Sequence, residues 1–114
     1  MLYGVRAVVL LSQEGKLLLV RLVDPDTGDA WWVPPGGRME DRDDSVQACA
    51  AREVYEETGL QVDVGRLVYY REFIELARNR LWLEMYFLAD RFNGTATLDG
   101  LDNRSPGETF LREL

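Results

Sequence analysis

The strongest constraint on how this chain can fold lies in residues 52–60, which read REVYEETGL. An α-helix turns by about 100° per residue, so Glu53, Glu56 and Glu57 would fall on one helical face. Like charges on one face repel, and an ordinary exposed helix would interleave basic residues there. A divalent cation would offset this repulsion, because hard metal ions prefer oxygen ligands. The segment therefore predicts a helix that ends at Gly59 and presents carboxylates suited to such an ion.

A second motif precedes this helix. Residues 32–37 read WVPPGG and are followed by a polar loop. Together, residues 37–60 resemble the signature of the Nudix hydrolases, the MutT-like family. That signature is a glycine, five residues, a glutamate, seven residues and then Arg-Glu-apolar-any-Glu-Glu-any-Gly-apolar. Its second half is matched here at every fixed position, and the motif covers roughly a fifth of the chain.

The first half of the signature departs from the family pattern. Its glutamate is replaced by Asp43 or Asp44, and the spacing is one residue too long. An insertion inside a helix would rotate its faces, whereas a loop tolerates an extra residue. We therefore expect Asp44 to take the place of the glutamate and to cap the helix or brace the loop.

The resemblance implies a fold as well. It predicts an α+β protein of the Nudix type, an α/β/α sandwich with a mixed β-sheet, in one domain over residues 1–114. The family usually has a further helix near the C-terminus, and only residues 109–114 are left for it. We expect this C-terminal helix to be short or missing, with the sheet otherwise covered by a reduced layer or by a partner subunit.

The resemblance also implies a reaction, the attack of water on a phosphoanhydride in a nucleoside diphosphate linked to another moiety. Glu53, Glu56 and Glu57, with the Gly36 carbonyl, are expected to hold Mg²⁺ or Mn²⁺. Glu53 and Glu57 are the expected catalytic carboxylates, and Glu53 is also a candidate proton acceptor. Arg52 lies one turn before Glu56 and is expected to orient a carboxylate.

A further acid often follows the last long strand in this family. Glu108 and Asp102 are the candidates here, with Asp99 as a third, and each is equally well explained as a turn residue. Glu84 is another candidate if its face of the strand turns toward the helix.

No substrate-binding residue can be chosen from the sequence. A nucleobase needs an aromatic or apolar slot, and the available side chains are Trp31, Trp32, Tyr3, Phe73 and Tyr86. All of them are also suitable core or surface aromatics. Distal phosphates could contact Arg71, Arg78 or Arg80, which are otherwise explained as solvated charges of a hairpin.

Composition narrows the chemistry. The chain has no histidine and a single lysine, Lys16, which excludes histidine metal sites and histidine acid–base pairs. The net charge of −7 disfavours nonspecific binding to nucleic acid or to an anionic membrane. A polyphosphate substrate would require metal ions that invert the local field.

Cellular location and partners are constrained more loosely. The single cysteine, Cys49, excludes an internal disulfide and fits a reducing cytoplasm. No base is offered near Cys49, so we expect a small buried residue and not a nucleophile. No stretch is apolar enough for a membrane span or a secretory signal. We expect a cytoplasmic protein with a small-molecule substrate and no nucleic-acid or membrane partner, and a homodimer is left open.

Apolar patterns predict strands at residues 3–11, 17–23, 31–33, 62–76 and 81–90. We expect the first two to form a hairpin around a turn at 13–16, and the two long ones to pair around 77–80. A helix is predicted from Asp44 or Ser45 to Thr58, and its apolar residues on two sides indicate cover by more than one neighbour.

Two other interpretations compete with an enzyme. A noncatalytic Nudix-fold module that senses a nucleotide would be expected to lose the helix carboxylates, which this chain keeps. A structural domain without a ligand is the third interpretation. A metal site in the folded state must raise the melting temperature by mass action, so melting with and without Mg²⁺ or Mn²⁺ separates it from the others.

Overall fold

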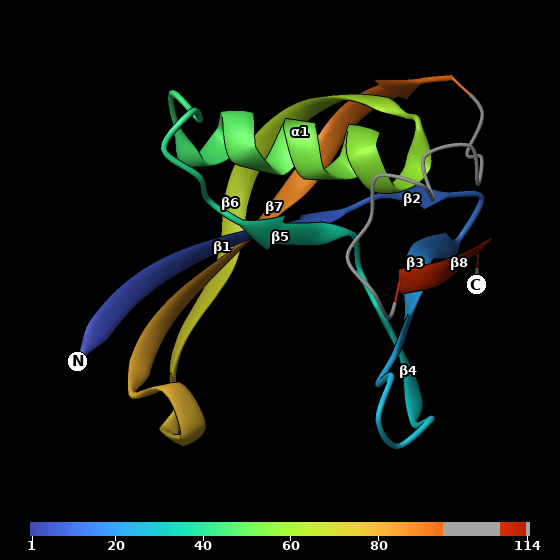
Figure 1. Ribbon diagram of the computed structural model, residues 1–114. Coiled ribbons are helices and arrows are strands. Elements are labelled where there is room, and N and C mark those ends of the chain that lie inside the picture. Colours follow the sequence, from blue (N-terminus) through green and yellow to red (C-terminus); the bar gives the residue numbers. More distant parts are fainter. Residues whose placement is uncertain (95–107, 114) are drawn as a thin grey trace.

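The computed structural model describes residues 1–94 and the backbone of residues 108–113, which form two β-sheets and one α-helix (Figure 1). The strands are β1 (Leu2–Leu10), β2 (Ser12–Gln13), β3 (Lys16–Val23), β4 (Ala30–Val33), β5 (Gly36–Arg38), β6 (Gln61–Glu75), β7 (Arg80–Asn93) and β8 (Glu108–Glu113). Helix α1 spans Val46–Thr58, and the 3-10 turn η1 (Leu76–Arg78) joins β6 to β7. None of the helices described here is long and apolar enough to cross a lipid bilayer.

The first sheet is mixed and has the strand order β5-β1-β7-β6. Strand β1 runs parallel to β7, with Leu2 opposite Arg80 and Leu10 opposite Leu88. Strands β5 and β6 are antiparallel to their neighbours. Parallel strands need a long crossover connection, and here that connection contains α1. The mixed sheet and the pairing of the two long strands around η1 confirm the predictions.

The second sheet has the order β2-β3-β4, with β8 also paired to β3. The prediction that residues 3–11 form a hairpin with residues 17–23 was wrong, because β1 pairs with β5 and β7 instead. Within the predicted hairpin, the short strand β2 pairs with the first two residues of β3, and the Leu18 N–H donates to the Leu11 carbonyl at 2.9 Å. The chain thus passes from one sheet to the other near Leu11.

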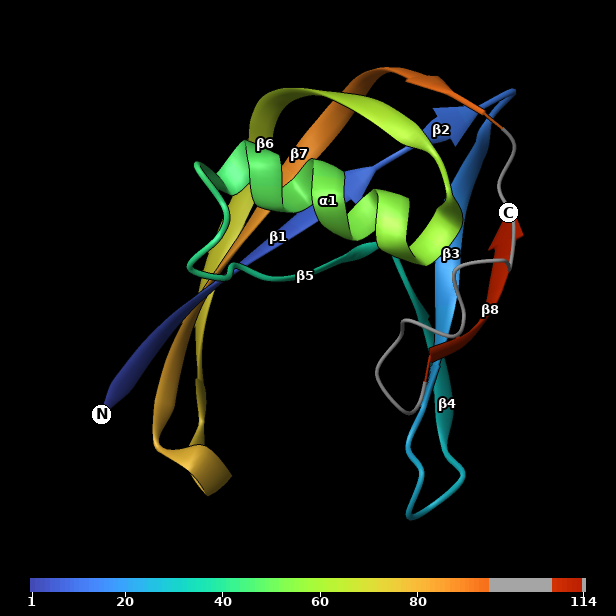
Figure 2. The same cartoon turned by 45° about the horizontal axis from the view of Figure 1, so that its top comes forward.

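The C-terminal segment is extended where a short helix was the alternative. Strand β8 pairs antiparallel with β3, with Leu18 opposite Glu113. Among the described residues, α1 is therefore the sole α-helical layer, and it lies across one face of the first sheet while the second sheet stands beside it (Figure 2). The α+β class is confirmed, with no C-terminal helix in this part of the chain.

Helix α1 begins and ends at local signals. The Ser45 hydroxyl accepts a hydrogen bond from the Ala48 N–H at 3.0 Å, which identifies Ser45 as the N-cap. Gly59 follows the last turn with a φ of 79°, and its N–H donates to the Tyr55 carbonyl at 2.8 Å. Of the two predicted N-caps, Ser45 is therefore correct and Asp44 is not.

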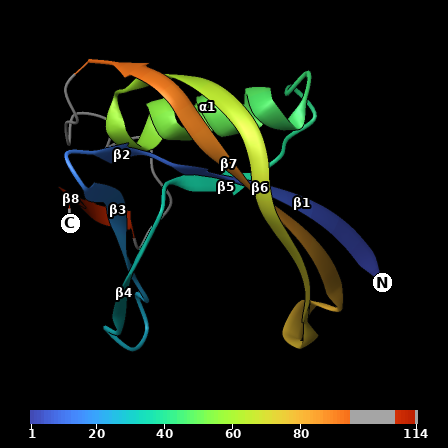
Figure 3. The same cartoon turned by 180° about the vertical axis from the view of Figure 1, so that it is seen from behind.

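One face of α1 packs on the first sheet, and the view from behind shows β6 and β7 crossing in front of the helix (Figure 3). Ala50 and Val54 are fully buried against a core that includes Val9 and Phe87. Helix α1 contacts β1, β5 and β6, as expected of a helix covered by more than one neighbour, but Tyr55 on its second apolar side is 56% exposed. A small sheet supplies one apolar face, so the second apolar side of the helix has no layer from residues 1–94 to pack on.

Candidate active site

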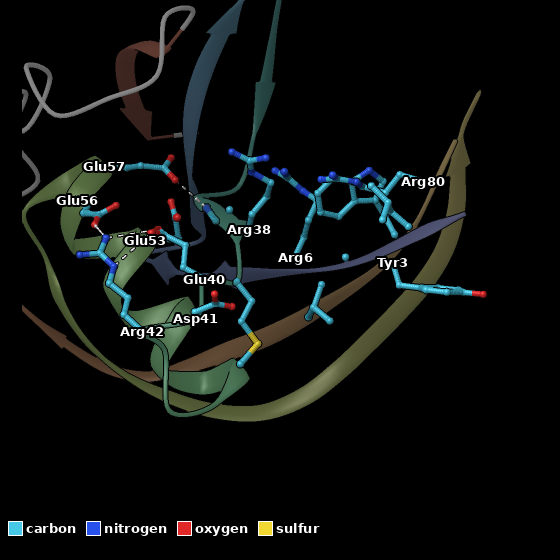
Figure 4. Close-up of a pocket in the computed structure, with 17 residues that line it drawn as sticks. Tyr3, Arg6, Arg38, Glu40, Asp41, Arg42, Glu53, Glu56, Glu57 and Arg80 are labelled. Atoms are coloured by element: carbon cyan, nitrogen blue, oxygen red, sulfur yellow. Dashed lines mark hydrogen bonds and ion pairs between the residues drawn. The ribbon is translucent and has the colours of Figure 1, made fainter. Parts of the chain in front are cut away.

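The acidic helix face borders a pocket of about 940 Å³ (Figure 4). Glu53, Glu56 and Glu57 line it from α1, and the glycines Gly36 and Gly37 line it from β5. The starts of β1 and β7 and the loop of residues 39–42 form the rest of the lining. The structure therefore brings together the helix carboxylates and the glycine pair, as the sequence predicted.

Glu57 links the helix directly to β5. Its side chain is buried, with 3% of the residue exposed, and its Oε1 accepts a hydrogen bond from the Gly36 N–H at 3.2 Å. A buried carboxylate that accepts a backbone hydrogen bond is held in one orientation. This contact places the end of α1 against the glycine pair.

The two glycines are explained by close approach of other groups. Neither Gly36 nor Gly37 has a positive φ, and both lie in β5. A Cβ on Gly37 would overlap the Glu53 carboxylate, and a Cβ on Gly36 would overlap the Ala7 carbonyl oxygen.

The surroundings of Glu53 change its acidity. Burial raises the pKa of Glu53 above its usual value, although the neighbouring Arg52 charge opposes the shift. Arg52 Nη1 donates to Glu53 Oε1 at 3.0 Å. The backbone of Gly37 closes the other side of this carboxylate. A carboxyl group with a raised pKa is the better proton acceptor.

Arg52 is the centre of an ion-pair network behind the pocket. It binds Asp43 with two contacts of 2.8 Å, one from Nε to Oδ1 and one from Nη2 to Oδ2. Its Nη1 also contacts Glu53 at 3.0 Å and Glu56 at 3.2 Å. The hydrogen bond with Asp43 raises the pKa of Arg52, so the guanidinium stays charged. This geometry holds two helix carboxylates in place.

Asp43, and not Asp44, braces the loop before the helix. The Asp43 side chain is 4% exposed, accepts from the Glu40 N–H at 2.8 Å and binds Arg52, whereas Asp44 is exposed. The hydrogen bond from Arg52 lowers the pKa of Asp43 to about 2. The expectation that Asp44 caps the helix or braces the loop was wrong, because Ser45 is the N-cap and Asp43 binds Arg52. The residue between Asp43 and Ser45 lies outside the helix.

The helix carboxylates have the oxygen chemistry that Mg²⁺ and Mn²⁺ require. In the structure, Glu56 contacts Arg42 Nη2 at 3.0 Å and also contacts Arg52. In the part of the chain that the structure describes, no three acidic, cysteine or histidine side chains converge closely enough to hold an ion in this arrangement. The donor set fits such a metal, and an ion would compete with Arg42 for Glu56.

Of the candidates for a further acidic residue, the structure describes the side chain of Glu84 alone. Met85 and Phe87 face α1, so Glu84, at the alternate position on β7, faces away from the helix. Desolvation opposes its ionisation, but hydrogen bonds from Tyr86 at 2.6 Å and Arg71 at 2.8 Å outweigh it and lower the pKa of Glu84. Glu84 is therefore held by Arg6, Arg71 and Tyr86 on the face of the sheet opposite to α1. The other candidates, Asp99, Asp102 and the side chain of Glu108, lie outside the described residues.

The aromatic candidates are dispersed. Tyr3 lines the pocket, whereas Trp31 and Trp32 are exposed on β4. Trp82, which we did not single out, lines the pocket but is only 5% exposed. Among the described residues that line the pocket, Tyr3 is therefore the one exposed aromatic side chain.

The arginine candidates separate clearly. Arg71 pairs with Glu84 at 2.8 Å, and the exposed Arg78 lies 3.8 Å from Glu75. Arg80 lines the pocket. Two further arginines of the wall, Arg6 and Arg38, were not found from the sequence. The available signal was a charged residue inside the apolar run of β1, and one directly after the glycine pair.

Cys49 matches its prediction. It is fully buried, and burial raises the pKa of its thiol to about 12. A thiol with so high a pKa is not a nucleophile near neutral pH.

Comparison with known proteins identifies the family to which this sequence is similar. The sequence matches the NUDIX domain family over residues 2–113. It is 41% identical over 61 residues to a MutT-like protein of Streptomyces ambofaciens, covering 54% of this chain and 36% of that protein. It is 27% identical over 113 residues to an RNA pyrophosphohydrolase of Novosphingobium aromaticivorans, covering 89% of this chain and 69% of the other.

The structure gives the same answer for the fold. It resembles a crystal structure of a MutT NUDIX hydrolase from Burkholderia pseudomallei with a TM-score of 0.78 and 23% identity, covering 99% of this chain and 83% of the other. The chain spans 36%, 20% and 52% of the lengths of three curated relatives that it matches. The near-complete family match, the shared fold and the facing of REVYEETGL onto the glycine pair lead to one conclusion: the chain belongs to the NUDIX domain family.

Proposed function

We propose that this chain is a Mg²⁺- or Mn²⁺-dependent pyrophosphohydrolase that splits a phosphoanhydride in a nucleoside diphosphate linked to another moiety. The observation that carries this proposal is the pocket of about 940 Å³ with Glu53, Glu56 and Glu57 on one wall, facing the glycine pair. The names of two relatives, a MutT-like protein and an RNA pyrophosphohydrolase, support the reaction class.

Glu56, Glu57 and the Gly36 carbonyl are the groups that would hold the metal, which leaves Glu53 to accept a proton. When bound, a divalent ion would neutralise phosphate charge and lower the pKa of a water molecule. It would also reverse the negative field of this wall, which in a chain of net charge −7 otherwise repels a polyphosphate.

The residues of the chain have separate roles in this proposal. Glu53 accepts the proton of the attacking water, since burial raises its pKa. Glu57 is fixed by the Gly36 N–H and supplies a carboxylate oxygen of set orientation. Arg52 is a positioning residue, because it contacts Glu53 and Glu56 but is not part of the pocket wall.

We also propose a cytoplasmic location and a small-molecule nucleotide substrate. The buried free thiol of Cys49 suits a reducing compartment. The net charge of −7 does not suit a protein that tracks a nucleic-acid backbone. A homodimer stays a prediction.

A substrate panel and one matched pair of variants test the proposal. The protein is incubated with Mg²⁺ and a set of nucleoside triphosphates, nucleotide sugars, ADP-ribose and dinucleoside polyphosphates, and the released phosphates are identified. Glu57→Gln should lower turnover of the best substrate by at least about a hundredfold with an unchanged circular dichroism spectrum, because a neutral amide is a weak ligand for a hard cation. Glu72→Gln, which removes the same charge from an exposed position on β6, should leave turnover unchanged.

Two outcomes would contradict the proposal. Comparable turnover in Glu57→Gln would remove Glu57 from the mechanism. Binding of a nucleotide without any release of phosphate across the panel would favour the noncatalytic sensing module instead.

A further inference from the structure

The wall of the pocket opposite the carboxylates is basic. Arg6, Arg38 and Arg80 lie together on one side of the pocket, and Glu53, Glu56 and Glu57 lie on the other (Figure 4). The three arginines come from β1, β5 and β7, which are adjacent strands of the first sheet. A chain with 20 acidic and 13 basic residues has thus gathered basic groups at one place in its candidate active site.

These arginines are poorly neutralised. Arg6 and Arg38 are directly opposite each other in the register of β1 and β5, and like charges in such a pair are destabilising. Arg6 lies 3.4 Å from Glu84, a carboxylate that it shares with Arg71. The ion pairs of the described residues include none for Arg38 or Arg80.

Arg80 carries the clearest sign of a missing partner. Its Nε is buried and has no hydrogen-bond acceptor among the described residues. A buried donor of this kind costs about 1–3 kcal/mol when it stays unpaired, and more when it is charged. Native proteins keep few such groups, and those they keep call for an explanation such as a ligand.

A buried tryptophan holds two of the arginines in place. The guanidinium carbons of Arg6 and Arg80 lie 5.8 Å and 5.2 Å from the centre of the Trp82 ring. Trp82 Nε1 donates to Glu75 at 3.3 Å. Gly4 leaves room for this ring, since a Cβ there would lie 2.6 Å from it. Arg6 and Arg80 are therefore held in position by the protein itself, without a ligand.

We propose that Arg6, Arg38 and Arg80 bind a phosphate group of the substrate other than the pair joined by the scissile bond. This inference rests on the proposed function of the pocket and narrows its substrate class. Guanidinium groups match phosphate through paired N–H donors, and a phosphate would offset the repulsion between Arg6 and Arg38. The substrate thus carries a third phosphate, either on a longer phosphate chain or on the group attached to the diphosphate.

The first test measures binding without metal, so that it does not depend on hydrolysis. Inorganic tripolyphosphate is titrated into the protein in EDTA, and the Nε–Hε signals of the arginines are followed by NMR. The signals of Arg6 and Arg80, assigned from Arg6→Lys and Arg80→Lys, should shift in a saturable manner. Arg80→Gln should weaken binding at least about tenfold, since a charge-assisted contact is lost. Arg91→Gln, an exposed arginine of β7 outside the pocket, is the matched control and should bind like the parent.

The second test compares substrates under turnover with Mg²⁺. For a nucleoside triphosphate, or for a nucleotide sugar with an additional phosphate monoester, Arg80→Gln should raise KM about tenfold and change kcat little. For a nucleotide sugar with an uncharged sugar, KM should stay within about twofold of the parent. Whichever phosphate-bearing substrate responds identifies the source of the third phosphate.

The outcomes separate this proposal from the general function. Hydrolysis that is lost in Glu57→Gln but insensitive to Arg80→Gln for every substrate, with no shift of the Arg6 and Arg80 signals, would overturn the phosphate site and leave the hydrolase intact. Absence of hydrolysis with saturable, Arg80-dependent tripolyphosphate binding would support the phosphate site and count against the enzyme.

Discussion

Asp43 and Asp44 carry the same side chain at adjacent positions, yet the structure uses them differently. Asp43 binds both the Nε and the Nη2 of Arg52, whereas Asp44 is exposed. Spacing alone favoured Asp44, because it preserves the distance to Arg52 along the chain. The side chain that reaches Arg52 is set by the turn in which Glu40 and Asp43 exchange hydrogen bonds, and that turn has no strong signature in the sequence.

Replacing these two residues separates the alternatives. Asp43→Asn should lower the free energy of unfolding by about 1–3 kcal/mol at pH 7, because Arg52 loses its paired acceptor. Asp44→Asn should stay within about 0.5 kcal/mol of the parent, as for an exposed site. Urea unfolding at pH 7 measures both values. Equal effects of the two substitutions would contradict the assignment of Asp43.

The same pair predicts a pH dependence with a definite sign. The pKa of Asp43 is about 2 in the folded protein and about 3.9 in an unfolded chain, so its contribution is present above pH 4 and is lost as the pH falls toward 2. Asp43→Asn should therefore lose less stability between pH 5 and pH 3 than the parent does. Thermal melts at these two pH values provide the measurement, with Asp44→Asn as the control.

Alanine at Gly36 and alanine at Gly37 should have different effects, one on stability and the other on turnover. At Gly36 an added Cβ would meet the backbone of Ala7, which cannot move, so Gly36→Ala should destabilise the fold by about 1–3 kcal/mol. At Gly37 the Cβ would meet the end of the Glu53 side chain, which can rotate away. Gly37→Ala should therefore retain most of the stability and lose turnover, measured by urea unfolding and initial rates on the same samples. Full activity in Gly37→Ala would show that Glu53 does not need this position.

Among the elements, α1 is the one whose sequence and structure agree most closely. Its N-cap Ser45, its stop at Gly59 and its acidic face all depend on residues close together in the chain. Strand pairing behaves differently. Residues 3–11 and 17–23 satisfy the local rules for a hairpin, but β1 is paired with β7 in parallel. The local sequence pattern does not indicate a parallel partner far along the chain, so the pairing of β1 was predicted wrongly.

The cap of α1 offers a test of how far the helix depends on its own sequence. Ser45→Ala should lower the free energy of unfolding by about 1 kcal/mol, since the Ala48 N–H loses its acceptor. Ser12→Ala, on the exposed strand β2, should change it by less than about 0.5 kcal/mol. Urea unfolding monitored by helix ellipticity measures both. An unchanged stability in Ser45→Ala would show that packing of Ala50 and Val54 alone fixes the start of the helix.

Considered as a whole, the molecule has a net charge of −7 and a pocket whose two walls carry opposite charges. The acidic wall repels a polyphosphate unless metal ions are bound, and the basic wall attracts one. Binding of Mg²⁺ or Mn²⁺ should therefore complete the site and stabilise the folded protein by mass action.

This coupling predicts a melting experiment. Millimolar Mn²⁺ or Mg²⁺ should raise the melting temperature relative to KCl at equal ionic strength, since binding at a hundred times the Kd contributes about 2.7 kcal/mol. Glu57→Gln should reduce the increase, and Glu72→Gln should preserve it. Equal melting temperatures in the metal and KCl samples, at concentrations that support turnover, would contradict a metal site on α1.

The acidic face of α1 could be predicted from the sequence, whereas the arginines that lie opposite it could not. The spacing of Glu53, Glu56 and Glu57 defines one face through the local geometry of a helix, so the acidic wall followed from neighbouring residues. The basic wall arises because β1 lies between β5 and β7, which puts Arg6 and Arg80 near the same ring of Trp82. That arrangement depends on which distant strands bury each other's surfaces, a choice made by the packing of the entire sheet.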